Sequence, residues 1–512
     1  MSSKTLTALV APQPQQVLVR ALALRGIALA GLCAHVSLWL QIDGLFGVDG
    51  IAPIGASLQK FMQTQDGADF HLAPTLLWLL PTDAAMHGLC AIGSLACVAV
   101  LGGLAPRLPL AVAFATMLSL VTAADDFMSF QWDALLLEAL FLAIWLAPRG
   151  LCKPQQDGGP TQLSLWLLRW LALRLYLLSA LVKWLSGDPT WHDLTALQYH
   201  YWTQPLPGPL SWFADAMPAS GHTFEAAFLF FAEGLAPLLV FMGRRLRLLG
   251  VAVMLLLQLG IASTGNYGFF NLLTVALLLT LLDDGAIIAL LPKRLRPLPL
   301  LPIVVPQQPF WRRLTHGLSA SLLLVLASLT TLHRVNRDLL PEAMEAALAW
   351  LHPLHISNTY GLFATMTTER PEIEVELSLD GQKWELLQFQ YKISDMHQRP
   401  PLVGPHMPRL DWQMWFAALG NCEKNHWFVK FQRRLLLGSK PVRALLAVDP
   451  LQGQPARYVR STLWQYQFAP WPDLRDKHIW WQRQRVGAYC PTLTLEDGHL
   501  VRARVVNEAT IR

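Results

Sequence analysis

The chain has 512 residues, of which 53% are hydrophobic and 15% are charged, and its formal net charge is +5. Soluble proteins usually carry about 25% charged residues, so this composition excludes an ordinary soluble enzyme and indicates a membrane protein. The basic residues lie beside apolar segments rather than on one polar face, which argues against nucleic acid as a partner.

Charge is distributed unevenly and divides the chain in two. Residues 1–353 carry 20 Lys and Arg and 20 Asp and Glu, whereas the much shorter segment 354–512 carries 20 and 15. The charged fraction therefore rises from about 11% to about 22% across this boundary. We predict a polytopic helical membrane domain over residues 1–353 and a water-soluble domain over residues 354–512.

The first part contains about nine segments that are apolar enough to cross a bilayer or nearly so. A membrane-spanning helix needs roughly 17 to 25 mostly apolar residues. Two segments are short for a full crossing, and residues 73–80 form a further short or re-entrant candidate. The nine segments are 18–41, 82–104, 107–121, 128–147, 162–186, 222–243, 246–263, 267–282 and 310–333.

Basic residues in the connecting loops predict the orientation, because cytoplasmic loops carry an excess of Lys and Arg. With a cytoplasmic N-terminus, fourteen basic residues fall on the cytoplasmic side, and Lys60 alone falls in a short loop on the other side. The domain at 354–512 is then extracytoplasmic. The fourteen are Lys4, Arg20, Arg25, Arg107, Arg149, Lys153, Arg244, Arg245, Arg247, Lys293, Arg294, Arg296, Arg312 and Arg313.

The extracytoplasmic domain is predicted to be β-rich with a helical insertion. Polar and apolar residues alternate from Glu372 to Leu379, and Asp380-Gly381 then predicts the tight turn of a β-hairpin. This pattern of short runs and turns is typical of a small sandwich or jelly roll. The other predicted elements are strands within 384–389, 457–468 and 492–506, the last divided at Asp497-Gly498, and a helical stretch near 411–437.

Arg and aromatic residues in this domain are candidates for a binding surface, because binding surfaces are enriched in both. The alternative is that Trp412 and Trp415 form the core-facing stripe of a helix, and that Arg409–Asp411 or Arg370–Glu369 are structural ion pairs. The candidates for this surface are Arg370, Arg399, Arg409, Asp411, Trp412 and Trp415.

Two cysteines, Cys422 and Cys490, are the only ones expected in the oxidising compartment. A disulfide between them is one possibility, and two buried free thiols are the other. No C-x-x-C motif is present, so thiol–disulfide exchange has no motif here.

Charged residues at bilayer depth are costly and are functional candidates for that reason. At about 1.5 Å rise per residue, Glu138, Arg174 and Glu233 fall near mid-membrane, whereas Asp133 and Lys183 fall in the outer third. We interpret the deep cluster as a structural bracket that joins three helices. If the protein is an enzyme, the catalytic candidates are the charged residues in the outer third of the membrane and the histidines of the adjoining loop, with Lys183 as a base. The alternative is that Lys183 pairs with Asp133. The full catalytic set is Lys183, Asp133, His192 and His200.

Several familiar chemistries have no motif in the chain. The G-x-S-x-G elbow, the P-loop and a strand-linked G-x-G-x-x-G are absent from the sequence. The spacing of His192 and His200, and that of His397 and His406, matches no zinc-ligand pattern, so we expect no metal site. No cofactor is assigned.

Four long motifs carry a resemblance to a known family. FQWDALLLEALFLAIWLAP (130–148), GDPTWHDLTALQYHYWTQPLPGP (187–209), NTYGLFATMTTERPEIEVELSLDGQKWE (358–385) and HQRPPLVGPHMPRLDWQMWFAALG (397–420) resemble the lipase maturation factor family. The resemblance covers nearly the whole chain. It implies a membrane protein that assists folding and assembly of exported proteins, lipases first, in a chaperone-like manner rather than as an enzyme.

The chain departs from the animal members, which are endoplasmic-reticulum membrane proteins. It contains no N-x-S/T sequon although a large domain is predicted to be exported. The resemblance therefore favours a bacterial inner membrane, and an endoplasmic-reticulum membrane if the source is eukaryotic. The resemblance implies membrane lipid and an exported client as partners, and it makes the Arg, Asp and Trp candidates of the exported domain candidates for client binding.

A more distant similarity gives the alternative function. A helical half followed by an exported β-domain, and Leu181-Val182-Lys183-Trp184-Leu185 before an aromatic loop, is similar to the vitamin K-dependent carboxylase and its bacterial relatives. That enzyme carries adjacent lysines there, and the second position here is Trp184. This similarity implies a membrane enzyme acting on a lipid-soluble ligand or an exported polypeptide.

Overall fold

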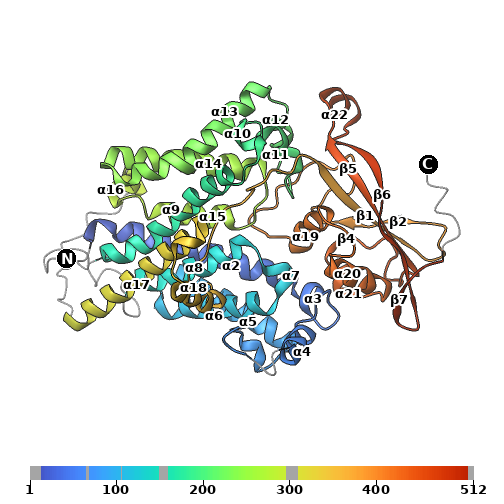
Figure 1. Ribbon diagram of the computed structural model, residues 1–512, viewed down its shortest axis with the longest axis horizontal. Helices are drawn as coiled ribbons and strands as arrows, with labels where there is room; N and C mark the ends of the chain where they lie inside the picture. The colour runs from blue at the N-terminus through green and yellow to red at the C-terminus, as the bar shows by residue number, and fades with distance from the viewer. Residues whose placement is uncertain (1–12, 65–68, 105, 149–158, 296–309, 505–512) are drawn as a thin grey trace.

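The computed structural model describes residues 13–64, 69–104, 106–148, 159–295 and 310–504. Its long helices gather at one end and a β-sheet lies at the other, with α19, α20 and α21 between the two (Figure 1). Lys4, Arg149, Lys153 and Arg296, which entered the orientation count, lie outside the described residues.

The helical region has six helices among the described residues that are long and apolar enough to cross a membrane, and seven if one bent pair is counted as a span. The chain is therefore an integral membrane protein. The bent pair is α15 (Phe270–Leu279) and α16 (Asp284–Leu290), whose axes differ by 116°. The six are α2 (Val17–Trp39), α5 (Asp83–Leu101), α9 (Gln162–Leu185), Ala219–Phe241, α14 (Arg244–Thr264) and Leu314–Val335 within α17 (Phe310–Val335).

The predicted count of nine spans is not confirmed. The predicted segments at 107–121 and 128–147 do form helices, but α6 (Arg107–Ala123) has 17 residues and α8 (Gln131–Leu146) has 16. Both lie at or below the shortest length that crosses a bilayer. Composition could identify these helices as apolar, but it could not show how tightly the rest of the protein would enclose them.

The span at Ala219–Phe241 is irregular. It begins as α13 (Ala219–Phe230), passes through a π-helical turn, η4 (Phe231–Leu235), and ends as the 3₁₀ segment η5 (Ala236–Phe241). Pro237 lacks the N–H that a regular α-helix needs at this point, which accounts for the change of helix type. Glu233 lies in the π-helical turn, a feature that is frequent at functional sites.

Shorter helical elements connect the long ones. Before α9 they are η1 (Pro14–Gln16), α3 (Ile42–Phe46), α4 (Ile54–Thr64), η2 (Leu76–Trp78) and α7 (Asp125–Met128). After it they are α10 (Pro189–His192), α11 (Leu197–Thr203), α12 (Ser211–Asp215), η6 (Lys293–Leu295), η7 (Arg337–Leu339), α18 (Glu342–Leu351) and η8 (His352–Leu354).

The C-terminal region is built on one antiparallel sheet with the strand order β2-β1-β5-β6-β7. The predicted hairpin turns are present: Gly381 has φ of 78° between β1 and β2, and Asp497 and Gly498 have φ of 50° and 78° between β6 and β7. The strands are β1 (Arg370–Ser378), β2 (Glu385–Leu386), β5 (Tyr458–Phe468), β6 (Trp481–Glu496) and β7 (His499–Arg502).

The sheet is not one half of a sandwich or jelly roll, and that part of the prediction is not confirmed. The second sheet among the described residues contains only two short strands, β3 (Gln388–Phe389) and β4 (Leu446–Val448). Ile373, Val375 and Leu377 on β1 are fully buried, and α19 (Arg409–Ala418) and α20 (His426–Leu436) pack against the sheet. Helices thus provide the cover that a second sheet was expected to provide. Two further helices are α21 (Lys440–Arg443) and α22 (Trp471–Lys477).

Candidate functional site

Many buried polar contacts join the helical region to the C-terminal region, and we call this set of contacts the interdomain joint. At its centre, Arg409 at the start of α19 forms a bidentate ion pair with Asp133 in the first turn of α8, at 2.7 and 2.9 Å. Arg409 also donates to the carbonyl of Phe127 at 2.8 Å. Both charged side chains are almost fully buried, so each compensates the desolvation of the other.

A second part of the joint lies five residues further along α8. The Glu138 carboxylate is paired with Arg174 of α9. It also accepts hydrogen bonds from the backbone N–H of Asn358 at 2.8 Å and from the Tyr360 hydroxyl at 2.6 Å. Arg174 donates to the Asn358 carbonyl at 3.1 Å. The segment that leads into the C-terminal region is therefore held inside the helical bundle by a buried ion pair.

Gly361 lies in the same segment, and its backbone conformation and close packing require a glycine. Its N–H donates to the Gln131 side-chain oxygen at 2.6 Å, and its φ is 142°, a region that L-residues rarely adopt. A Cβ at this position would lie 2.4 Å from a methyl carbon of Val182 on α9. The contact brings the backbone of the segment directly against the helix.

Replacing Gly361 with Ala should therefore be strongly destabilising. Backbone strain and steric overlap each cost about 1–3 kcal/mol, so we expect a loss of about 2–6 kcal/mol, measured as thermal unfolding in detergent. Gly487→Ala is the matched control, because a Cβ there meets nothing within 4 Å. The double variant Gly361→Ala, Val182→Ala should recover part of the lost stability. If Gly361→Ala unfolds at the wild-type temperature, neither backbone strain nor overlap with Val182 requires a glycine at this position.

A third part of the joint uses backbone carbonyls at the end of α11. Arg370, the first residue of β1, donates to the carbonyls of Trp202 at 2.7 Å and Pro205 at 3.0 Å, and also to that of Gln204. Trp415 of α19 donates from its indole to the Thr203 carbonyl at 2.8 Å. One arginine and one tryptophan thus bind the aromatic loop of the helical region.

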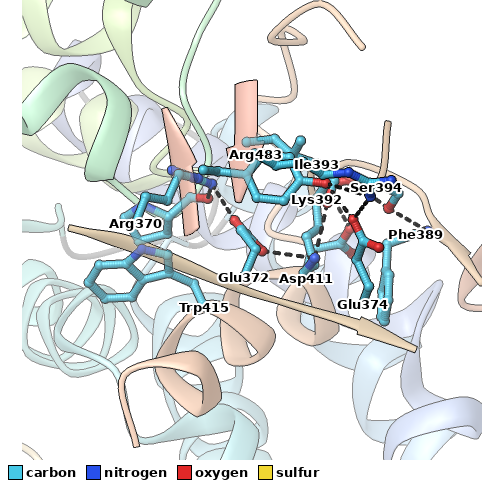
Figure 2. A network of polar contacts seen from close by, with 12 residues as sticks. Arg370, Glu372, Glu374, Phe389, Lys392, Ile393, Ser394, Asp411, Trp415 and Arg483 are labelled. Atoms are coloured by element: carbon cyan, nitrogen blue, oxygen red, sulfur yellow. Dashed lines mark hydrogen bonds and ion pairs between the residues drawn. The ribbon is translucent and has the colours of Figure 1, made fainter. Parts of the chain in front are cut away.

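Figure 2 shows how β1 extends this contact into a buried polar network. Glu372 is paired with Arg370 at 2.7 Å and with Lys392 at 2.8 Å. Asp411 accepts the backbone N–H of Lys392 at 2.8 Å, and burial raises the pKa of Asp411 to about 6 despite the hydrogen bonds that lower it. Glu374 is paired with Arg483 of β6. The network fixes the loop after β3 against the sheet.

The last part of the joint connects α2 with the segment before α19. Ser37 accepts the backbone N–H of Met407 at 2.8 Å, and Gln41 accepts that of Arg409 at 2.8 Å. Asn266, which precedes α15, binds Pro401 and Val403 through both ends of its amide, each at 2.8 Å. The polar motif around residues 397–420 is therefore a contact surface for the membrane helices.

These positions correct the predicted client-binding surface. Arg370, Arg409, Asp411, Trp412 and Trp415 all have relative exposures of 6% or less, so they cannot contact a client in this structure. The unusual density of Arg and Trp results from the docking of the two regions. Arg399 is different, because it is exposed and lies over the Trp480 ring at 5.7 Å.

The predicted grouping of the membrane charges is also corrected. Arg174 and Glu138 are paired as expected of the deep cluster, but the Glu233 carboxylate binds the Lys183 ammonium at 2.8 Å instead. Lys183 is thus not the partner of Asp133, which binds Arg409. Depth along each helix could be counted from the sequence, but which faces of the helices meet could not.

Of the four catalytic candidates, only Lys183 and His200 come together. Asp133 is in the joint, and the exposed His192 ring is stacked on Trp184 with centroids 4.9 Å apart. Lys183 and His200 do line one cavity, of about 480 Å³, between α9, α11, α13 and α14. Within the described parts of the chain, no group of three or more His, Cys, Asp and Glu residues could hold a metal ion.

Cys422 and Cys490 form a disulfide with a Cα–Cα distance of 5.4 Å. It connects the turn between α19 and α20 to the middle of β6. The covalent bond therefore fixes the position of the joint's helix α19 relative to the sheet.

Comparison with known proteins gives the family. A family model described as the lipase maturation factor transmembrane domain matches residues 18–289, and one described as the lipase maturation factor C-terminal domain matches residues 356–491. The chain belongs to the lipase maturation factor family. No solved structure matches the chain.

Relatives in the family are similar over most of their length. Lipase maturation factor 2 of Gallus gallus is 33% identical, and the alignment covers 93% of this chain and 82% of that protein. Lipase maturation factor 1 of Mus musculus is 32% identical, with 94% and 88% covered, and that of Homo sapiens is 32% identical with the same coverage.

In this member of the lipase maturation factor family, the four motifs that carry the resemblance supply the joint. Asp133 and Glu138 belong to the first, Thr203 to the second, Asn358, Tyr360 and Arg370 to the third, and Arg409 to the fourth. Ser37, Gln41 and Asn266 were not identified from the sequence, since single polar residues near helix ends carry no pattern.

Proposed function

We propose that this protein is a membrane-bound maturation factor that assists folding or assembly of exported proteins, with lipases as the first clients. The relatives named lipase maturation factor 1 and 2 support lipases as clients, and the docking of the two regions supports a chaperone-like mechanism. A domain held on membrane helices by buried ion pairs keeps its outer surface at a fixed height above the bilayer. That geometry suits a chaperone-like role for chains that have just crossed the membrane.

The proposed orientation places the N-terminus in the cytoplasm and the C-terminal region on the other side. The Cys422–Cys490 disulfide supports it, because disulfides persist in oxidising compartments. The loop residues Arg244 and Arg247 also support it: they lie at the N-terminal end of α14 and pair with Asp283, whereas Asn266, just after the other end of α14, contacts the C-terminal region. A bacterial inner membrane is the proposed location.

The client-binding element in this proposal is the outer edge of β6. Strand β7 pairs only with Leu493–Glu496, and no strand among the described residues pairs with the outer edge of Gln482–Ala488. An unpaired edge presents backbone donors and acceptors that an extended polypeptide can join as a new strand. Val486 on this edge is 61% exposed, and Arg485 beside it is also exposed.

A gene deletion and one matched pair of variants test the proposal. Deletion should lower the yield of active secreted lipase. Restoring the gene with Val486→Glu should leave that yield about threefold or more below the yield with the wild-type gene. Val448→Glu is the control, because Val448 is 52% exposed on β4, away from the β6 edge. Unchanged yields of every exported lipase after deletion would overturn the lipase assignment, and equal effects of the two variants would overturn the edge.

The alternative of a carboxylase-like enzyme has less support. Lys183 does line a cavity, but its ammonium is held by Glu233 at 2.8 Å and by the Ser179 carbonyl at 3.2 Å. Asp133 and His192, which completed the proposed catalytic set, are not among the residues that line this cavity. The side chains needed for one reaction are thus distributed over different parts of the protein.

A further inference from the structure

The cavity beside Lys183 has the size and lining of a ligand site. Its volume is about 480 Å³, and most of its walls are apolar, with Leu175, Phe228 and Leu257 from three different helices. Sites for small molecules usually measure about 300–1,000 Å³ and combine apolar walls with a few fixed polar groups. Phe363 of the C-terminal region closes one side, so the cavity is complete only when the two regions are docked.

The rim of the cavity shows where a ligand would enter. Leu256 and Leu259 are 56% and 66% exposed, and Gly260 follows them on α14. Helix α14 is one of the helices of membrane-spanning length and composition. Exposed leucines on such a helix face acyl chains, so the occupant is expected to come from the bilayer.

The charged groups of the cavity are already compensated. Lys183 binds both oxygens of Glu233, at 2.8 and 3.1 Å, and Glu225 accepts the Tyr201 hydroxyl at 2.9 Å. Two carboxylates and one ammonium line the cavity, so the balance of charge disfavours an anionic headgroup. The matching ligand is uncharged.

Two polar atoms of lining residues have no partner, and their chemistry can be assigned. Gln204 donates its amide N–H groups to backbone carbonyls, so its oxygen accepts the Tyr267 hydroxyl proton at 3.0 Å. His200 Nε2, 3.3 Å from the same hydroxyl oxygen, must then be the donor, which leaves Nδ1 as a bare acceptor. Burial and then the charge of Lys183 lower the pKa of His200 to about 4, so the ring is neutral at pH 7.

The second unpaired atom is the amide nitrogen of Gln131. Its oxygen accepts the Gly361 N–H, which fixes the orientation of the amide and leaves Nε2 as a free donor. Gly361 and Phe363 are two residues apart, within about 7 Å along the backbone, and Phe363 contacts the His200 ring with centroids 4.8 Å apart. Gln131 and His200 both line the cavity, so one donor and one acceptor without partners belong to its lining residues.

We propose that this cavity binds an uncharged lipid that carries a hydroxyl group next to an ester carbonyl, as in a mono- or diacylglycerol. The ligand hydroxyl donates to His200 Nδ1, the carbonyl accepts from Gln131 Nε2, and the acyl chain leaves between the leucines of α14. The proposal does not depend on the identity of a client.

Binding of defined lipids to the delipidated full-length protein tests the ligand class. We expect saturable binding of monoolein and of 1,2-dioleoylglycerol, measured by native mass spectrometry or with a radiolabelled lipid. Methyl oleate has the ester but no hydroxyl and should bind about tenfold more weakly, because the His200 acceptor stays unpaired. Equal binding of methyl oleate, or tighter binding of oleate, phospholipid or a quinone, would overturn the assignment.

Variants test the location. Gly260→Trp should close the rim and lower bound monoolein at least about tenfold, whereas Gly88→Trp on α5 should leave binding unchanged. A Cβ at either glycine meets nothing within 4 Å, so both variants are expected to fold. Gln131→Glu keeps the oxygen that binds Gly361 but replaces the free donor and should weaken monoolein binding. Wild-type binding in Gly260→Trp and Gln131→Glu, with both proteins folded, would contradict the proposed site.

Discussion

Replacing Arg409 with Met should destabilise the folded protein by about 3–5 kcal/mol, which is the usual loss when one partner of a buried ion pair is removed. The Asp133 carboxylate is completely buried, and its two oxygens are bound by Arg409 at 2.7 and 2.9 Å. Met fills a similar volume but leaves this carboxylate without a counter-charge. Thermal unfolding in detergent, followed through protease release of the C-terminal region, measures the effect.

Two further variants separate loss of the pair from general damage. Arg399→Met removes an exposed arginine of the same region and should change stability by less than about 0.5 kcal/mol. The double variant Asp133→Leu, Arg409→Met replaces the buried pair with apolar side chains and should be clearly more stable than Arg409→Met alone. If the single and double variants unfold at the same temperature, the ion pair is not what holds α19 on α8.

Replacing Glu138 with Gln should have an effect of similar size, about 3–5 kcal/mol, for a different reason. Gln keeps an oxygen that can accept from Tyr360, but it leaves the buried Arg174 guanidinium without its carboxylate. The segment at Asn358–Gly361 should then dissociate from the bundle before the helices unfold. Hydrogen exchange of the Asn358 and Gly361 amides, followed by mass spectrometry, should show lost protection there first.

Glu342→Gln, at an exposed position in the first turn of α18, is the matched control and should behave as wild type. The double variant Glu138→Gln, Arg174→Gln removes both charges and should regain part of the lost stability. Preserved protection at Asn358 and Gly361 in the single variant would show that the backbone contacts alone hold the segment.

The sequence identified which membrane residues carry unusual charge, but it could not identify their partners. Asp133, Glu138, Arg174, Lys183 and Glu233 were selected because charge is scarce in apolar helices, and all five are in buried ion pairs. Depth alone suggested that charges at one level pair with each other. The partner of Asp133 lies 276 residues away in another region, and no periodicity within a helix encodes such a distance.

The C-terminal region shows the same limit. Local signals gave the hairpins, because Asp380-Gly381 and Asp497-Gly498 need left-handed backbone that few other residues tolerate. They did not give the first half of β6, whose Gln482-Arg483-Gln484-Arg485 sequence has no apolar alternation. That half is an exposed edge, so it needs no buried face and leaves no pattern in the sequence.

The Asp133–Arg409 pair also has a consequence for the order of assembly. During synthesis, α8 is made with an acidic side chain whose cationic partner has not yet been translated. The counter-charge of the Asp133 carboxylate is therefore missing until the chain has extended past residue 409. Docking of the C-terminal region is therefore the step that neutralises a buried charge of the helical region, and a chain truncated before Arg409 would leave the Asp133 carboxylate without its partner.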